Sequence, residues 1–160
     1  MKKLISMAAV AALVAGGSYA ADVDSSAGAD IVAPLQVANA TALYFGTVVP
    51  SIANADTVIV SATGAKTCGA ELTCLTSDHT AAAFNVTGET DRVYTITLPN
   101  SVQISNGSEN MDVDNFTGSK ASGTLTSGAD SFTVGGTLDV GANQAAGEYT
   151  GTFTVTVEYQ

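Results

Sequence analysis

The chain has 160 residues and is strongly acidic, because 15 Asp and Glu residues stand against 5 Lys and Arg residues, for a formal net charge of −10. A surface of that sign repels nucleic-acid phosphates and anionic lipids, so we expect neither nucleic acid nor an anionic membrane surface as a partner. The length suits one domain with a hydrophobic core of its own.

The first twenty residues have the three parts of a secretory signal peptide. Lys2 and Lys3 supply the positive start, an apolar run follows, and Ser18 and Ala20 are the small residues that a signal peptidase requires. We therefore expect residues 1–20 to be removed and the protein to be exported, through the periplasm to the cell surface or the extracellular space. The apolar run is short of the roughly 20 residues of a membrane span, so no membrane insertion is expected.

An alternation of apolar and polar side chains begins directly after the expected cut. Odd positions carry mostly small apolar side chains, whereas Asp22 and Asp24 stand at even positions. This pattern in residues 21–29 is typical of a flexible extension or of a strand that waits for a partner. In the second case its apolar face consists of Ala21, Val23, Ala27 and Ala29. From Ala29 onward the alternation predicts a core strand of the domain, which we place at residues 30–160.

The middle of the chain is rich in Thr, Val, Ala, Gly and Ser and has no long stretch with helical apolar spacing. Short β-branched or aromatic runs bounded by Gly, Pro, Asn or Asp predict strands. The clearest runs are residues 57–61, 83–87, 93–98, 111–113 and 132–134. Short strands with such boundaries predict an all-β sandwich or barrel without helix beyond the signal peptide.

Cys68 and Cys74 are the only cysteines in the sequence. A cysteine pair in an exported protein most often forms a disulfide, which we expect here. A metal site is the alternative, but the pair and the lone His79 supply fewer ligands than structural zinc usually takes. Closing so short a loop should stabilise the fold by ~2 kcal/mol.

Residues 148–159 show the most regular alternation in the chain. Even positions carry only Thr or Glu, whereas the odd positions are apolar or aromatic apart from Gly151. The pattern predicts a long final strand with one buried face. The core face of this strand consists of Tyr149, Phe153, Val155, Val157 and Tyr159.

No catalytic or cofactor-binding motif is found in the sequence. His79 is the one histidine, and its neighbours Ser77 and Asp78 do not form a catalytic triad merely by adjacency. The glycines lack the pattern of a phosphate-binding loop. Asp112 and Asp114 could ligate calcium, but their spacing fits no complete calcium loop. We expect a protein that is not an enzyme and that needs no cofactor, with calcium binding left open.

A series of motifs spans nearly the whole mature chain. The motifs are the runs 34–37, 43–46, 83–88, 94–99, 132–138 and 146–159. In order and spacing they resemble the exported bacterial domain-of-unknown-function family DUF4402. The resemblance covers about residues 29–160 and implies class and location more than an activity.

The end of the chain carries a second, looser resemblance. The turn from Gly147 to Tyr149, followed by an alternating strand with the penultimate Tyr159, is similar to the C-terminus of chaperone–usher pilins and spore-coat-U-type domains. In those proteins an immunoglobulin-like sandwich lacks its last strand, and the N-terminal extension of the next subunit fills the groove. The resemblance implies an immunoglobulin-like antiparallel β-sandwich, either complete or completed by strand addition.

These observations lead to two expectations about function. The first is a structural subunit of a surface fibre or coat, with copies of itself or related subunits as partners and a periplasmic chaperone in transit. Residues 21–29 would then add to a neighbouring subunit as a strand. The alternative is a monomeric secreted binding module or adhesin, whose ligand surface lies on loops at residues 100–110 and 116–128.

Overall fold

The structure is a computed structural model, and it describes residues 21–75 and 78–160. The expected signal peptide, residues 1–20, lies outside the described residues. The chain divides into two units, Met1–Ile31 and Val32–Gln160. The second unit, called the domain below, contains every strand of the described residues.

Residues 21–31 form neither helix nor strand, and each side chain in this segment is exposed. Val23 and Ile31 are its large apolar side chains, with exposed fractions of 92% and 97%. The prediction of a core strand from Ala29 onward is wrong, because the first strand begins at Gln36 and all six of its side chains are exposed. An alternation of period two indicates a strand with two unlike faces, but it does not indicate where the strand finds its partner.

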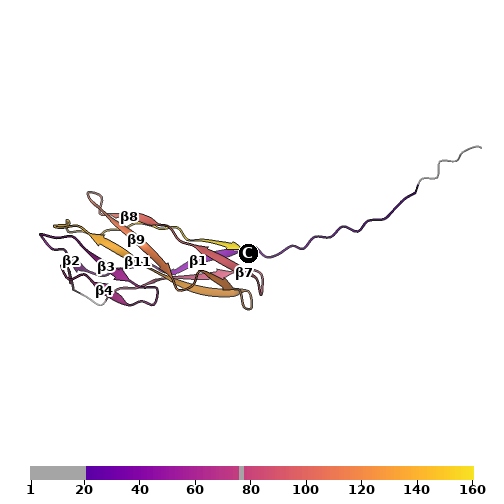
Figure 1. Ribbon diagram of the computed structural model, residues 1–160, viewed down its shortest axis with the longest axis horizontal. Coiled ribbons are helices and arrows are strands. Elements are labelled where there is room, and N and C mark those ends of the chain that lie inside the picture. The colour runs from indigo at the N-terminus through magenta and orange to yellow at the C-terminus, as the bar shows by residue number, and fades with distance from the viewer. Residues whose placement is uncertain (1–20, 76–77) are drawn as a thin grey trace, which may run out of the picture. The chain divides into compact units, whose positions relative to one another are not determined.

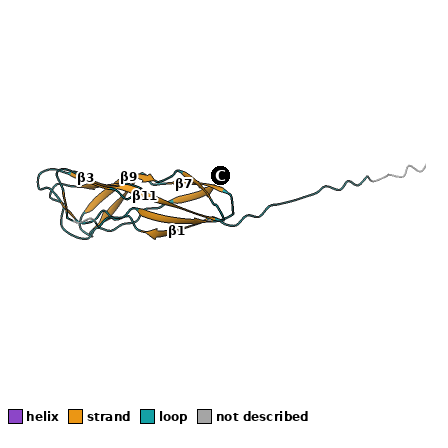
Figure 2. Cartoon of the chain, turned by 90° about the horizontal axis from the view of Figure 1, so that it is seen from below, coloured by secondary structure: helices purple, strands orange, loops and turns teal. Residues whose placement is uncertain are grey.

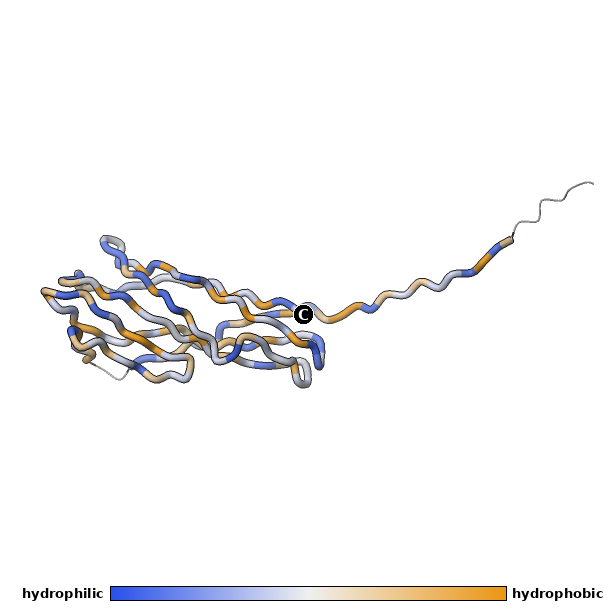
Figure 3. Tube along the Cα trace, in the orientation of Figure 1, coloured by the Kyte–Doolittle hydropathy of each residue, from blue (hydrophilic) through white to orange (hydrophobic). Residues whose placement is uncertain are grey.

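The prediction of an all-β protein is confirmed, since the described residues contain strands and no helix (Figure 2). In chain order the strands are β1 Gln36–Thr41, β2 Val48–Val49, β3 Asp56–Val60, β4 Lys66–Cys68, β5 Thr73–Cys74, β6 Ala82–Thr87, β7 Val93–Thr97, β8 Ser101–Ser105, β9 Asn110–Gly118, β10 Ser122–Thr124, β11 Ala129–Val140 and β12 Thr156–Tyr159. Apolar and polar residues are interleaved along the strands (Figure 3). Within residues 21–75 and 78–160, no helix has the length and hydropathy to cross a bilayer.

The larger sheet is built around β11, the twelve-residue strand at its centre (Figure 1). Its order is β1-β6-β11-β3-β4, and β9 with β8 beyond it lies on the other side of β11. Val134 pairs with both Ala82 of β6 and Gly118 of β9, which shows that β6 and β9 flank β11 on opposite sides. On the β6 side, β6 accompanies the first half of β11 and β3 accompanies the second half.

A three-stranded antiparallel sheet, β10-β7-β12, packs against the first half of β11 and against β6. The side chains between the two layers form the proximal core, so called because it lies near the C-terminus. Its buried members are Ala82, Phe84, Val86, Tyr94, Leu125, Phe132 and Val134. The rings of Phe84 and Phe132 stack at its centre, with centroids 5.2 Å apart. Two antiparallel layers around one core make this part of the domain sandwich-like.

A second cluster, the distal core, lies under the other half of β11. Its buried members are Phe45, Val58, Val60, Leu72, Val113, Leu138 and Val140. Leu43 and Phe116 are half-buried and pack against both cores, so they join them into one interior.

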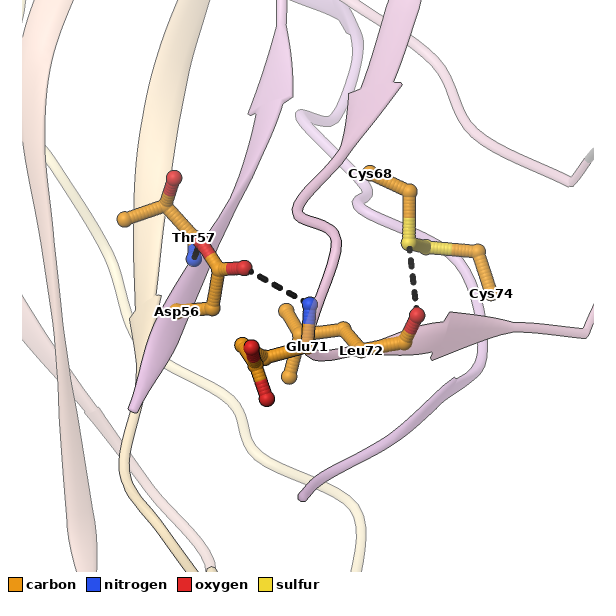
Figure 4. The surroundings of a disulfide bond; sticks show 6 residues. All are labelled: Asp56, Thr57, Cys68, Glu71, Leu72 and Cys74. Carbon is orange, nitrogen blue, oxygen red and sulfur yellow. Dashed lines mark hydrogen bonds between the residues drawn. A yellow bond between two sulfur atoms is a disulfide. The ribbon is translucent and has the colours of Figure 1, made fainter. Parts of the chain in front are cut away.

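The disulfide between Cys68 and Cys74 is confirmed, with an S–S distance of 2.08 Å (Figure 4). It links the ends of β4 and β5 across a short connection. The carboxylate of Asp56 supports this connection, because it accepts hydrogen bonds from the N–H groups of Glu71 at 2.9 Å and Thr57 at 2.8 Å. These two bonds, the one from Glu71 first, hold the pKa of Asp56 below its ordinary value.

Two segments that were expected to be loops carry strands instead. Residues 100–110 contain β8, and residues 116–128 contain the end of β9 and all of β10. Less of this surface is therefore free to form the loop-borne ligand site of a binding module.

Candidate assembly site

The last strand, β12, pairs with a described strand on only one side. It forms an antiparallel ladder with β7, and no other described strand pairs with it. The N–H of Gln160 donates to the C=O of Val93 in this ladder. Since backbone groups alternate in direction along an antiparallel pair, Val157 and Tyr159 turn their own N–H and C=O groups away from β7. β12 therefore presents an unpaired edge.

The apolar side chains of β12 and of the residues just before it are only half-buried. Four of them pack against the proximal core: Phe153, Val155, Val157 and Tyr159. The Thr and Glu side chains between them are exposed. The ring of Phe153 lies edge-on to Phe84 at 6.1 Å and contacts Phe116 at 4.9 Å between centroids. Since none of the four is fully buried, this flank of the proximal core is incompletely covered.

The expected strand over residues 148–159 is shorter in the structure. Regular pairing is confined to β12, and Thr150 forms only an isolated bridge with Ser105 at the end of β8. The last segment thus begins beside the larger sheet and ends in the smaller one. A segment that changes sheets cannot keep one ladder along its whole length, although its side chains keep one alternation.

The other flank of the site is β1, which pairs with β6 alone among the described strands and is an edge strand of the larger sheet. Just before β1, Leu35 packs against the proximal core. The hydroxyl of Tyr159 donates to the C=O of Ala33 at 2.9 Å and accepts from the N–H of Glu89 at 2.7 Å. These bonds tie the end of β12 to the entry of β1. We call the boundary between these two edge strands the seam.

An apolar hollow of about 650 Å3 lies at the distal core. Residues 44–50, which follow β1, and residues 144–149, which precede the last segment, supply two of its walls. Its apolar lining includes Phe45, Val48, Ile104, Met111, Leu138 and Val140. β2, which belongs to this wall, lies at the end of the domain away from the C-terminus (Figure 1). The segments that form the two flanks of the seam, β1 and the last segment, are thus connected along the chain to the walls of the hollow.

Tyr149 lines this hollow, although its place in the alternation predicted the core face of the last strand. Its side chain is half-buried, and its hydroxyl donates to the C=O of Ala145 at 2.9 Å. The side-chain amide of Gln144 donates to the same hydroxyl at 3.0 Å. Both bonds hold the ring of Tyr149 in the wall.

On the β10 side of β7, an ion pair and a tyrosine connect the smaller sheet to β11. The ammonium of Lys120 lies 2.9 Å and 3.0 Å from the two oxygens of Asp130, and the hydroxyl of fully buried Tyr94 donates to the same carboxylate at 3.0 Å. Burial raises the pKa of Asp130, but the bonds from Lys120, the Ser131 N–H and Tyr94 outweigh it, so the pKa is lowered. Sequence reasoning missed this network because Tyr94 and Asp130 are 36 positions apart.

Three carboxylates gather on the outer face of the larger sheet. The pKa of Asp139 on β11 is raised by burial and then by the charges of Asp114 and Asp112 on β9. The latter two are the calcium candidates of the sequence. Within the described parts of the chain, no group of three His, Cys, Asp or Glu side chains is placed to hold a metal ion. The geometry therefore gives the calcium hypothesis no support, and the cluster is a site of charge repulsion.

The remaining candidates are placed as follows. Ala21, Val23, Ala27 and Ala29 are exposed in residues 21–31, where no strand forms. The ring of His79 makes a hydrogen bond of 3.0 Å with the C=O of Gly64. Ser77 lies outside the described residues. An added strand made of residues 21–29 needs a second chain to pair with, and it remains a prediction.

Comparison with known proteins gives one family. The family described as Domain of unknown function (DUF4402) matches residues 35–159, and the chain belongs to this family. Neither a curated protein nor a solved structure matches the chain. The looser similarity to pilins stays a prediction.

Proposed function

We propose that this chain, as a member of DUF4402, is an exported structural subunit of a surface fibre or coat that assembles by β-strand addition and is not an enzyme. The observation that carries the proposal is the unpaired edge of β12, where Val157, together with Phe153 and Val155 just before the strand, is only half-buried against the proximal core. This edge offers backbone hydrogen bonds and an incompletely covered core at the same place.

An uncovered strand edge is a hazard to a protein that must stay monomeric. Natural edge strands are commonly protected by Lys, Pro, a bulge or a covering loop. β12 reads Thr-Val-Glu-Tyr and contains neither Lys nor Pro, and its one charged residue, Glu158, lies on the exposed face. An added strand would pair its backbone with this edge and place alternate side chains on the core, which is the usual mode of β-strand addition.

The N-terminal extension, residues 21–29, has the pattern that such a strand requires. Val23, Ala27 and Ala29 share one parity, and Asp22 and Asp24 have the other. In an added strand, one parity faces the core of the neighbour and the other faces solvent. A shift by one residue would bury the two aspartates, so the charges fix which face enters.

Export is the premise of this function. The expected signal peptide predicts it, and the Cys68–Cys74 disulfide is compatible with an oxidising compartment. An open edge during export would need protection, and a periplasmic chaperone that pairs with β12 until assembly would supply it. The expected final partners are copies of the chain or related subunits.

The experiment is to examine the exported protein by size-exclusion chromatography with light scattering and by negative-stain electron microscopy. The full mature chain should form fibres or long oligomers. A variant in which residues 21–29 are replaced by a Gly-Ser stretch of equal length should stay monomeric and keep the thermal transition of the domain. Antibody labelling of native cells should decorate surface filaments.

A different outcome would favour the alternative function. A mature chain that stays monomeric at high concentration, with and without cellular chaperones, and that labels the surface diffusely would indicate a free-standing binding module and would contradict fibre assembly.

A further inference from the structure

The apolar hollow at the distal core has no role in a subunit that only pairs strands along β12. The two chain segments that flank the seam nevertheless lead into the walls of the hollow. Residues 44–50 follow β1, and residues 144–149 lead into the last segment, so both flanks of the seam extend into the walls of the hollow. A strand that lies along the seam would reach the hollow at one of its ends.

The point at which residues 21–31 join the domain determines which end of the added strand reaches the hollow. The C=O of Ala33 accepts a hydrogen bond from the hydroxyl of Tyr159. In every copy, residues 21–31 therefore start from the Tyr159 end of the domain. Tyr149 and the hollow lie at the other end of the last segment. When copies stack head to tail, the Tyr159 end of one copy meets the hollow end of the next. Residues 21–31 then run along the seam with Ala21 toward Tyr159 and Ile31 at the hollow, antiparallel to β12.

A copy cannot fill its own hollow in this way. Ile31 is two residues from Ala33 and can lie at most about 7 Å from it. The extended segment from Tyr149 to Tyr159 spans on the order of 30 Å. The occupant must therefore come from a second copy of the chain.

The length and parity of the two segments agree with this direction. Residues 21–31 and residues 149–159 both contain eleven positions. Directly opposed residues of an antiparallel pair have their side chains on the same face, so the odd positions of one segment must oppose the odd positions of the other. In the register that aligns both ends, Ile31 opposes Tyr149 and Ala27 opposes Phe153, which sets a small side chain beside a large one.

We propose that Ile31 of a second copy enters the apolar hollow beside Tyr149 and anchors an added strand that runs antiparallel to β12. This inference rests on the proposed function. Ile31 is the largest side chain of its parity in residues 21–31, and it is 97% exposed. The lining of the hollow is mainly apolar, although it includes Thr47, Gln144 and Glu148. Burying Ile31 there therefore removes apolar surface from water on both partners.

Cysteine cross-linking of the full exported chain tests the position of Ile31. One variant carries Ile31→Cys with Ala146→Cys, which lies in the wall of the hollow. The comparison variant carries Ile31→Cys with Gln160→Cys at the opposite end. The native disulfide closes within one chain and produces no ladder of linked copies. We expect a ladder on a non-reducing gel for the 31/146 pair and only unlinked chains for the 31/160 pair.

A matched pair of truncations measures the contribution of the anchor. Ile31→Ala should raise the concentration needed for assembly by about ten-fold or more, because the apolar contact in the hollow is lost. Val32→Ala removes apolar surface from the opposite parity and should change that concentration less than about two-fold. Both residues are exposed, so neither change should affect the folding of the domain.

The outcomes separate this inference from the function on which it rests. Fibres that link only through the 31/160 pair, or through neither pair, would overturn the anchor and leave strand addition standing. Equal effects of Ile31→Ala and Val32→Ala would also overturn the anchor. A parent chain that forms no oligomers would overturn both proposals.

Discussion

The hydroxyl of Tyr159 donates a hydrogen bond of 2.9 Å to the C=O of Ala33, which lies 126 positions earlier in the chain. The same hydroxyl accepts a hydrogen bond from the N–H of Glu89. One side chain at the end of β12 thus satisfies a backbone group at the entry of β1 and another beyond β6. The contact closes one end of the seam and fixes the point from which residues 21–31 start.

Replacing Tyr159 by Phe should weaken this closure. The ring stays, but the C=O of Ala33 and the N–H of Glu89 lose their partner, which should lower the free energy of unfolding by about 1–2 kcal/mol. Urea unfolding followed by circular dichroism measures the change. Tyr44→Phe is the matched control, because Tyr44 is 52% exposed and should change stability by less than about 0.5 kcal/mol. Equal stability of both variants and the parent would contradict the structural role of the hydroxyl.

The two faces of the last segment should respond differently to a charge. Val155→Asp places a carboxylate against the proximal core and should lower the free energy of unfolding by about 2–4 kcal/mol. Thr154→Asp puts the same charge on the exposed face and should have little effect on folding. Thermal unfolding of the two variants compares them directly. A parent-like melting temperature for Val155→Asp would show that this face is not part of the core.

The alternation of the last segment predicted which side chains face the core, but it did not predict which strands the segment pairs with. Period-two patterning reports which side of a strand is apolar, and it placed Phe153, Val155 and Val157 on the face that packs against the proximal core. It carries no information on which neighbour supplies the hydrogen bonds. The change from the larger sheet at Thr150 to the smaller sheet at β12 therefore could not be predicted.

Glycine explains the largest error in strand length. Sequence reasoning found only residues 132–134 of β11, because Gly135 and Gly136 bound the apolar run in the sequence. In the structure both lie inside the strand. A Cβ at Gly135 would collide with the backbone of Val60, Ser61 and Ala62, so this glycine lets the chain that leaves β3 pass close to β11. One sequence cannot distinguish that use of glycine from a turn.

Stability should depend on pH through Asp139. Its pKa is raised by burial and by Asp114 and Asp112, so the folded protein binds this proton more readily than the unfolded chain does. That contribution is fully present below the ordinary carboxyl pKa and is lost as the pH rises through the raised value. At pH 7 the charged carboxylate of Asp139 is partly desolvated and is repelled by the carboxylates of Asp114 and Asp112. Asp139→Asn should then raise the free energy of unfolding by about 0.5 kcal/mol, since solvent screens an exposed cluster.

Urea unfolding at several pH values measures this effect. The gain of Asp139→Asn should disappear at acidic pH, where the parent is also protonated, and it should shrink in high salt. Glu148→Gln removes an exposed charge from another segment and serves as the control. A gain that is independent of both pH and salt would mean that charge repulsion is not its cause.

The parity of the N-terminal extension gives the last prediction. If residues 21–29 add to the seam of a neighbour, Ala27 enters beside the core and Ser26 faces solvent. Ala27→Asp would bury an unpaired charge in the assembled state and should abolish polymerisation, whereas Ser26→Asp should leave it almost unchanged. Both positions are exposed in the described chain, so both variants should keep the melting temperature of the domain. Light scattering and electron microscopy compare their assembly. Equal tolerance of the two charges would refute strand exchange, because a tail without a partner has no inner and outer face.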